Sequence, residues 1–166
     1  MSIRTLALLL VLSFNAHAAG GHNHGVGNLD VSVEGEQLTL NLELPLDSAV
    51  GFERAPKNDK ERSALADAER LLKDATALFV PTPAAGCAIA SVTVEMPYTG
   101  KPSEGDGHAD IDARYVFRCA SPAVLKSVET GLFKQFKRLY RIEARRTTPS
   151  GQGAARLSAR QAVIAW

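Results

Sequence analysis

The sequence predicts an α+β fold, in which an antiparallel sheet has two helices packed on it and one disulfide braces the domain. Three observations support this prediction. Several short segments alternate apolar with polar residues at the period of two that is typical of a half-buried strand, and two segments repeat apolar residues at helical spacing. The chain also has two cysteines, and an even number in an exported protein indicates a disulfide.

The first elements form a predicted hairpin. Leu29, Val31 and Val33 alternate with polar residues before a turn at residues 34–36. Leucines then occupy every second position of the returning strand, at 38, 40, 42, 44 and 46. This pattern predicts two strands with one buried face, and Pro45 is expected to end the second strand or to lie at an edge.

The sequence after residue 57 predicts a helix. Asn58 and Glu61 have the spacing of a capping box, in which each side chain accepts from a free backbone N–H of the first turn. Apolar residues then recur at helical spacing: Leu65, Ala68, Leu71, Leu72, Ala75, Leu78 and Phe79. Pro81 and Pro83 end this helix, whose apolar stripe is expected to pack on the sheet.

Two further predicted strands, 87–96 and 111–119, flank a polar, Gly-rich loop at residues 99–107. Antiparallel pairing across this loop would bring Cys87 beside Cys119, so that a disulfide between them is geometrically plausible. The apolar residues of the first strand are even-numbered, whereas those of the second are odd-numbered. A bulge or an asymmetric loop must therefore absorb one residue, or the strands are not immediate neighbours.

The C-terminal part predicts a second helix and two more strands. Ser121 is expected to cap the helix, with Pro122 at its first position. The apolar face of this helix would consist of Val124, Leu125, Val128, Leu132 and Phe133. Segments 139–144 and 162–166 have the composition of strands, and a turn at residues 149–153 lies between them. No repeat or linker marks a second domain.

The N-terminal residues predict a secretory signal peptide. A cationic start at residues 1–4 precedes an apolar run at 6–14 and the small-x-small cleavage pattern Ala16-His17-Ala18. The run is shorter than the roughly 20 residues that span a bilayer, so stable membrane insertion is not expected. We therefore expect residues 1–18 to be removed on export. Residues 19–166 would form a single α+β domain, with a flexible His-containing N-terminus at 19–25.

The composition argues against several classes of function. The net charge of +1 gives no field that would attract nucleic acid. A basic run at residues 134–146 is interpreted as a solvated face, with a weak docking surface for a partner as the alternative. The chain has neither a GxSxG nor an HExxH motif, and a disulfide would leave no free thiol. We therefore predict that the protein is not an enzyme.

Two histidines one residue apart, His22 and His24, lie in a Gly-rich stretch before the first strand. On an extended chain, residues two apart point the same way with about 6–7 Å between Cα atoms. Two imidazoles at this spacing can converge on one tetrahedral ion, and the glycines let the backbone bend around it. The alternative is an unstructured leader with incidental histidines.

A second candidate cluster precedes the predicted strand at residues 111–119. His108 and Asp110 are its main candidate ligands, and Asp106 and Asp112 are possible additional ones, because an imidazole with nearby carboxylates suits zinc and similar ions. The alternative is an acidic, solvated hairpin tip. Together with His22 and His24, this cluster would supply enough ligands for one closed site if the two segments meet in space.

The order of features resembles the ZrgA-like family of zinc-regulated periplasmic proteins along essentially the whole chain after the signal peptide. The resemblance rests on His-x-His-Gly at 22–25, Gly-Phe-Glu-Arg-Ala-Pro at 51–56, Ala-Leu-Phe at 77–79, Ala-Gly-Cys at 85–87, Tyr-x-Phe-x-Cys at 115–119, Leu-Phe-x-x-Phe at 132–136 and Gly-Gln at 151–152. It implies zinc binding in the periplasm, with a zinc uptake transporter or its periplasmic binding protein as partner. His22, His24 and His108 match the histidine segments of the family.

Two departures from the family pattern bear on zinc capacity. The His/Asp-rich tract that relatives often carry between the cysteines is reduced here to residues 104–112, and Arg54 stands where histidine commonly follows Gly-Phe-Glu. A guanidinium stays protonated and cannot replace an imidazole ligand. A single, weaker zinc site is therefore expected in place of high-capacity storage.

Two hypotheses of function follow. In the first, a periplasmic accessory protein captures Zn²⁺ and supports its delivery to a zinc uptake transporter. Zinc needs neutral imidazole, so binding should weaken as the pH falls through roughly 6.5. In the second, the chain is a non-catalytic interaction domain of the envelope with vestigial histidines, and its zinc affinity would be no tighter than about 0.1 mM.

Overall fold

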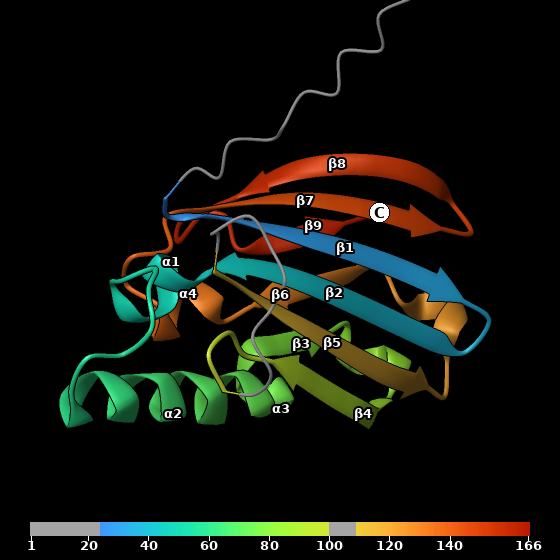
Figure 1. Cartoon of the computed structure of the whole chain (residues 1–166). Coiled ribbons are helices and arrows are strands. Elements are labelled where there is room, and N and C mark those ends of the chain that lie inside the picture. Colours follow the sequence, from blue (N-terminus) through green and yellow to red (C-terminus); the bar gives the residue numbers. More distant parts are fainter. Residues whose placement is uncertain (1–23, 100–108) are drawn as a thin grey trace, which may run out of the picture.

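The computed structural model describes residues 24–99 and 109–166, and its main element is a six-stranded sheet. The strands follow the spatial order β4-β5-β2-β1-β7-β8 (Figure 1). Their bounds are β1 Val26–Glu34, β2 Gln37–Pro45, β4 Cys87–Glu95, β5 Asp110–Cys119, β7 Arg141–Thr148 and β8 Gly151–Leu157. A second, three-stranded sheet has the order β3-β6-β9, with β3 Phe79–Pro81, β6 Ser127–Thr130 and β9 Val163–Ala165.

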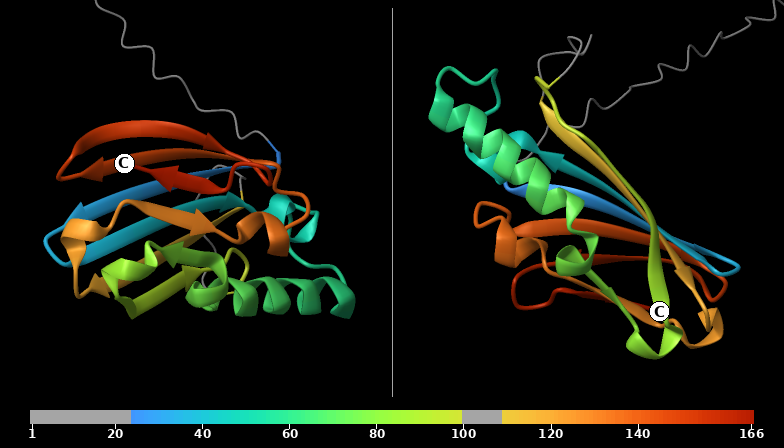
Figure 2. Two further views of the ribbon diagram at one scale, coloured as in Figure 1. Left: turned by 180° about the vertical axis from the view of Figure 1, so that it is seen from behind. Right: turned by 90° about the horizontal axis from the view of Figure 1, so that it is seen from below.

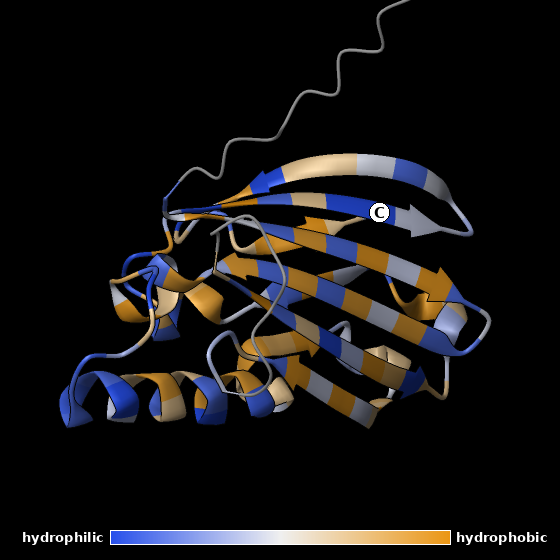
Figure 3. Ribbon diagram, in the orientation of Figure 1, coloured by the Kyte–Doolittle hydropathy of each residue, from blue (hydrophilic) through white to orange (hydrophobic). Residues whose placement is uncertain are grey.

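The small sheet and the helix α2 (Asp59–Lys73) lie on the same side of the large sheet (Figure 2). The strands of the large sheet alternate between apolar and polar residues (Figure 3). In β5 the odd-numbered residues are buried and the residues between them are more exposed, so that the opposite face is left largely to polar side chains. Tyr115 of β5 illustrates the packing of the covered face. Its ring meets Phe79 of β3 edge-on at 4.8 Å between centroids, and its hydroxyl donates to the carbonyl of Leu72 in α2.

The predicted hairpin is confirmed as β1 and β2. The two strands pair antiparallel, with Leu29 opposite Leu42 and Val33 opposite Leu38. All leucines of the period-two series, at 38, 40, 42, 44 and 46, are buried. Pro45 is the last residue of β2, as expected. This hairpin forms the centre of the large sheet, with β5 beside β2 and β7 beside β1.

The cysteine frame is also confirmed, and a bulge resolves its register. β4 and β5 pair antiparallel with Cys87 opposite Cys119, and a disulfide joins the two cysteines. The register shifts by one residue between Ile89 and Ser91. Beyond this bulge Val92 lies opposite Tyr115, so the even-numbered apolar residues of β4 share the covered face with the odd-numbered ones of β5.

The first predicted helix is confirmed, but it ends earlier than its apolar pattern. The Asn58 side chain accepts from the backbone N–H of Glu61 and starts α2. The helix ends at Lys73, and Asp74 caps a further short helix, α3, at Ala75–Leu78. The Glu61 carboxylate accepts from the N–H of Lys57, one residue before the position that a capping box would use.

Two expectations about the fold were wrong, and the strand β8 was not expected, because its first residues, 151–153, were assigned to a turn. The large sheet is mixed, not antiparallel, because β1 and β7 pair in parallel. The second helix is absent from residues 121–133, where a 3₁₀ turn at Pro122–Val124 leads into β6 and a single turn, α4, at Leu132–Gln135. β6 pairs with both β3 and β9, and these tertiary contacts outweigh the helical spacing of the apolar residues. A further 3₁₀ turn, Pro83–Ala85, follows β3.

Candidate metal site

A cluster of ionisable side chains lies at the end of the large sheet where β1 begins and β2 ends. The five-residue helix α1, Leu46–Val50, follows β2 directly. The N–H of Leu46 donates to the carbonyl of Ala109, the residue before β5. This end of the sheet therefore brings together the start of β1, the start of β5 and α1.

Three potential ligand atoms converge here. The His24 Nδ1 atom lies 3.0 Å from Oδ2 of Asp47 and 3.2 Å from Oε1 of Glu53. One ligand atom from each of the three residues lies within 4.8 Å of the others. The His24 side chain is 70% exposed, whereas those of Asp47 and Glu53 are only 13% and 30% exposed. The imidazole thus covers two partly buried carboxylates and faces solvent itself.

The backbone of His24 is held by its neighbours in space. The hydroxyl of Tyr140 donates to the His24 carbonyl at 2.6 Å, and the N–H groups of Tyr140 and Arg141 both donate to the carbonyl of Gly25. Gly25 has a φ of +75°, and a Cβ at this position would lie 2.0 Å from the Tyr140 ring. Only glycine allows the chain to turn here with the ring of Tyr140 packed directly on it.

Ser48 links His24 to Asp47. The N–H of Gly25 donates to Oγ of Ser48, which is fully buried, and this hydroxyl donates in turn to Oδ1 of Asp47. The other oxygen of the same carboxylate meets His24 Nδ1. A chain of hydrogen bonds therefore fixes the position of Asp47 relative to the histidine backbone.

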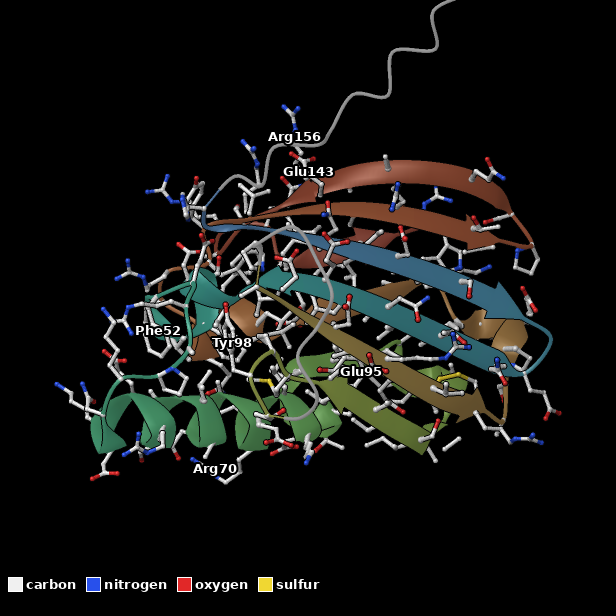
Figure 4. The ribbon with its side chains drawn as sticks, in the orientation of Figure 1. Phe52, Arg70, Glu95, Tyr98, Glu143 and Arg156 are labelled. Atoms are coloured by element: carbon white, nitrogen blue, oxygen red, sulfur yellow. A yellow bond between two sulfur atoms is a disulfide. The ribbon has the colours of Figure 1, made fainter. Side chains whose placement is uncertain are left out.

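Glu53 reaches the cluster because the chain reverses after α1. Gly51 ends α1 with a φ of +88°, and its N–H donates to the Asp47 carbonyl. The hydroxyl of Tyr98 donates to the carbonyl of Glu53 at 3.2 Å. Figure 4 labels Tyr98 together with Phe52, the residue between Gly51 and Glu53. The Gly-Phe-Glu segment thus places a carboxylate beside one that belongs to the preceding helix.

Arg54 is engaged outside this cluster. Its guanidinium makes two hydrogen bonds to the Glu61 carboxylate, at 2.7 and 2.9 Å, and lies 5.3 Å from the centroid of the Phe52 ring. These hydrogen bonds, with the one from the N–H of Lys57, lower the pKa of Glu61 to about 2. Arg54 therefore fastens the segment after α1 to the start of α2 and is not one of the converging ligands.

The donor set suits a divalent cation. In a tetrahedral zinc site with ligand atoms about 2.1 Å from the ion, neighbouring ligand atoms lie roughly 3.4 Å apart. The 3.0 and 3.2 Å separations at His24 require only a small outward movement. Two carboxylates beside one imidazole also bring an excess of negative charge, which a divalent ion would neutralise.

The predicted ligands fall into three groups. His24 lies in the cluster, whereas His22, His108 and Asp106 lie outside the described residues, as does the predicted signal peptide. Asp110 begins β5 opposite Pro45 and is not one of the three converging residues. Of the expected flexible segment 19–25, only His24 and Gly25 are described, and both are hydrogen-bonded as above.

Asp112 belongs to a different carboxylate group. It lies opposite Glu43 of β2 and Glu95 of β4 in the strand register. All three line a shallow cavity of about 250 Å³ on the polar face of the sheet, and Figure 4 labels Glu95 on this face. Partial burial, followed by the charges of Glu43 and Glu95, raises the pKa of Asp112.

Asp47 and Glu53 were not among the residues predicted from the sequence. Asp47 lies in a helix of five residues that follows the leucine series without a break, and no local pattern distinguishes it. Glu53 belongs to the Gly-Phe-Glu element, on which the family resemblance partly rested. That element was the one available signal, and it pointed to the segment but not to the role of its carboxylate.

The fold and the cluster define an α+β protein with an imidazole and two carboxylates at a sheet end, a class of site suited to binding a divalent cation. In the described part of the chain, no helix has both the length and the apolar character needed to cross a bilayer. The model of the ZrgA family of zinc uptake proteins matches residues 21–166, and the chain belongs to this family. A comparison with curated proteins gave no significant match.

Proposed function

We propose that the protein is a periplasmic zinc-binding accessory protein that captures Zn²⁺ and supports its delivery to a zinc uptake transporter. The observation that carries this proposal is the convergence of His24 Nδ1 with the carboxylates of Asp47 and Glu53 in a member of a zinc uptake family. Zinc is the cargo of this site. Its residues bind and release the ion without any chemical conversion, so the proposed role is not enzymatic.

The exposure of the site supports a role in transfer. Three protein ligands leave a fourth position of a tetrahedral ion open. The exposed imidazole of His24 is the ligand that an acceptor protein could displace first, while Asp47 and Glu53 still hold the ion. The proposed acceptor is the uptake transporter or its periplasmic binding protein, which would offer its own ligands to the open position.

Further ligands are proposed from the segments next to the site. His22 precedes His24 by two residues, and His108 is adjacent to Ala109, whose carbonyl accepts from the first residue of α1. We propose that one of these two histidines takes the fourth position until an acceptor ligand replaces it, with Asp106 and Asp110 as further candidates near His108. Asp112 has the least structural support among the ligands predicted from the sequence. It lies opposite Glu43 and Glu95 in the strand register and is not one of the residues that converge with His24.

Zinc titration by calorimetry tests the proposal on protein expressed with its own first 18 residues and purified from periplasmic extracts. Mass spectrometry of the same sample is expected to find an N-terminus at Ala19. We expect His24→Ala and Asp47→Asn each to weaken zinc binding by at least tenfold, because each removes one ligand. Asp67→Asn, which changes an exposed carboxylate of α2, is the matched control and should bind as the parent does.

Two outcomes would contradict the proposal. A parent protein with no zinc affinity tighter than about 0.1 mM (−5.5 kcal/mol) would favour the envelope interaction domain with vestigial histidines. Unchanged affinity in both His24→Ala and Asp47→Asn would place zinc elsewhere and make the cluster a surface ion pair. In the second case, His22→Ala and His108→Ala titrations would locate the ion.

A further inference from the structure

The protein has three tyrosines, and all three donate their hydroxyl group to a backbone carbonyl. The acceptor for Tyr115 is Leu72, inside the core. The acceptors for the other two are residues of the candidate metal site: Tyr140 donates to His24 and Tyr98 donates to Glu53. Both of these tyrosines are exposed to solvent, Tyr140 by 61% and Tyr98 by 44%.

Tyr140 is placed by backbone pairing and not by burial of its ring. Its N–H donates to the Gly25 carbonyl, just before β1 and β7 begin to pair in parallel with Val26 opposite Arg141. The ring then lies across Gly25, so the hydroxyl reaches the carbonyl of the preceding residue, His24. This 2.6 Å hydrogen bond ties His24 to the residue that immediately precedes β7.

Tyr98 adopts an unfavourable backbone conformation while it makes its contact. Its φ is +65°, and it is the one residue other than glycine with a positive φ in the described part of the chain. Aromatic residues adopt this left-handed region rarely, at an energetic cost that surrounding contacts must offset. The hydrogen bond to the Glu53 carbonyl links this strained residue to the segment after α1.

We infer that Tyr98 and Tyr140 are positioning residues of the zinc site, which hold Glu53 and His24 in place before the ion arrives. The inference rests on the proposed function. Glu53 and His24 are each carried by a short segment outside the sheet. If these segments moved freely, their conformational entropy would be lost when zinc binds. A hydroxyl that already fixes the carbonyl of the ligand residue removes part of this entropic cost, and the affinity rises accordingly.

The test compares three Tyr→Phe variants, each of which removes one hydroxyl and keeps the ring. Tyr98→Phe and Tyr140→Phe are expected to weaken zinc binding by roughly three- to tenfold, the effect of losing about one hydrogen bond. The melting temperature of the zinc-free protein should change little, since both rings are exposed. Tyr115→Phe is the matched control, because it leaves a buried carbonyl without its partner and should lower the melting temperature with zinc affinity unchanged.

A second measurement separates positioning from general stability. Co²⁺ bound in place of zinc reports its coordination geometry through the intensity of its visible absorption. We expect the spectrum of saturated Tyr98→Phe and Tyr140→Phe to differ from that of the parent, and the spectrum of Tyr115→Phe to match it. A merely structural role for the two exposed tyrosines would leave both the spectrum and the affinity unchanged.

The outcomes distinguish this inference from the proposed function. If His24→Ala and Asp47→Asn weaken zinc binding but Tyr98→Phe and Tyr140→Phe do not, the site is correct and the positioning role is wrong. If the parent protein fails to bind zinc, or if the two ligand variants bind as well as the parent, the proposed function itself is wrong. Weaker zinc binding in all three tyrosine variants would also overturn the inference. The loss of affinity would then result from a less stable protein and not from displaced ligands.

Discussion

At the scale of single residues, the candidate site depends on two glycines that let its ligands approach each other. Gly25 lies under the Tyr140 ring, and Gly51 reverses the chain between Asp47 and Glu53. Both have a positive φ, at +75° and +88°. A residue with a Cβ would be strained at either position, and at Gly25 it would also collide with Tyr140.

Comparing Gly25→Ala with an alanine at another glycine of positive φ separates the cost of backbone strain from the cost of moving Tyr140 away from the site. We expect Gly25→Ala to destabilise the protein by more than the about 1–2 kcal/mol that a left-handed alanine costs, and to weaken zinc binding, because Tyr140 must move away from His24. Gly35→Ala is the control, since Gly35 also has a positive φ (+58°) but an added Cβ meets nothing within 4 Å. Urea unfolding and zinc titration of both variants give the comparison. Equal effects of the two substitutions would contradict the role assigned to the Tyr140 contact.

At the scale of elements, the start of α2 and the segment after α1 stabilise each other. Arg54 joins them through Glu61, which also accepts from the N–H of Lys57. The sequence predicted the cap of α2 correctly because Asn58 and Glu61 are only three residues apart and their interaction is local. It did not predict the partner of Arg54, since that contact depends on the reversal at Gly51.

The Arg54–Glu61 pair predicts a specific dependence of stability on pH. The pKa of Glu61 is lowered from 4.5 to about 2, first by the hydrogen bond from Arg54 and then by that from Lys57. A lowered folded-state pKa contributes stability that is present above about pH 4.5 and is lost as the pH falls towards 2. Glu61→Gln should therefore lower the melting temperature at pH 7 and have little effect near pH 2.

The matched control for this prediction lies on the same helix. Glu69 pairs with Lys73 four residues later, and replacing it by glutamine removes a comparable carboxylate without disturbing the segment after α1. Thermal melts of the parent, Glu61→Gln and Glu69→Gln between pH 2 and pH 7 provide the measurement. A constant difference between the parent and Glu61→Gln across this range would show that the carboxylate acts through packing and not through its charge.

The two wrong expectations about the fold also belong to the scale of elements. Residues 124–133 carry apolar side chains at helical spacing, yet Val128 and Thr130 are buried on one face of β6 while Glu129 is exposed. Over such a short stretch the same apolar residues fit both the helical period of 3.6 and the strand period of two. The pairing with β3 and β9 decides in favour of the strand. The parallel pairing of β1 with β7 has no local signal at all, because the two strands lie more than a hundred residues apart in the chain.

At the scale of the whole molecule, the disulfide braces one edge of the large sheet. Cys87 starts β4, the edge strand, and Cys119 ends β5. Most residues of β4 are exposed, so this strand contributes less to the core than its neighbours do. The bond between the two cysteines therefore fixes a strand that packing alone would hold weakly.

Removal of this bond should lower the stability of the whole domain. The cysteines are 32 residues apart, and closing a loop of that length lowers the entropy of the unfolded chain, which raises the free energy of the unfolded state by about 3–4 kcal/mol at 25 °C. We expect the Cys87→Ser/Cys119→Ser variant to lose stability of this order in urea unfolding. The reduced parent protein is the control and should unfold at a similar urea concentration. A variant as stable as the oxidised parent would mean that β4 is held by its pairing with β5 alone.

The sequence by itself determined the features that a few neighbouring residues encode: the buried faces of β1, β2 and β5 and the cap of α2. It also made a bond between the two cysteines plausible, but it left a bulge as one of several ways to align their strands. It also indicated the family and His24. Only the tertiary structure decided which residues join His24. Gly25 and Ser48 are 23 residues apart, and His24 and Tyr140 are 116 apart. Such contacts arise because β1 lies between β2 and β7, and strand order is set by the packing of the whole core and not by any local pattern.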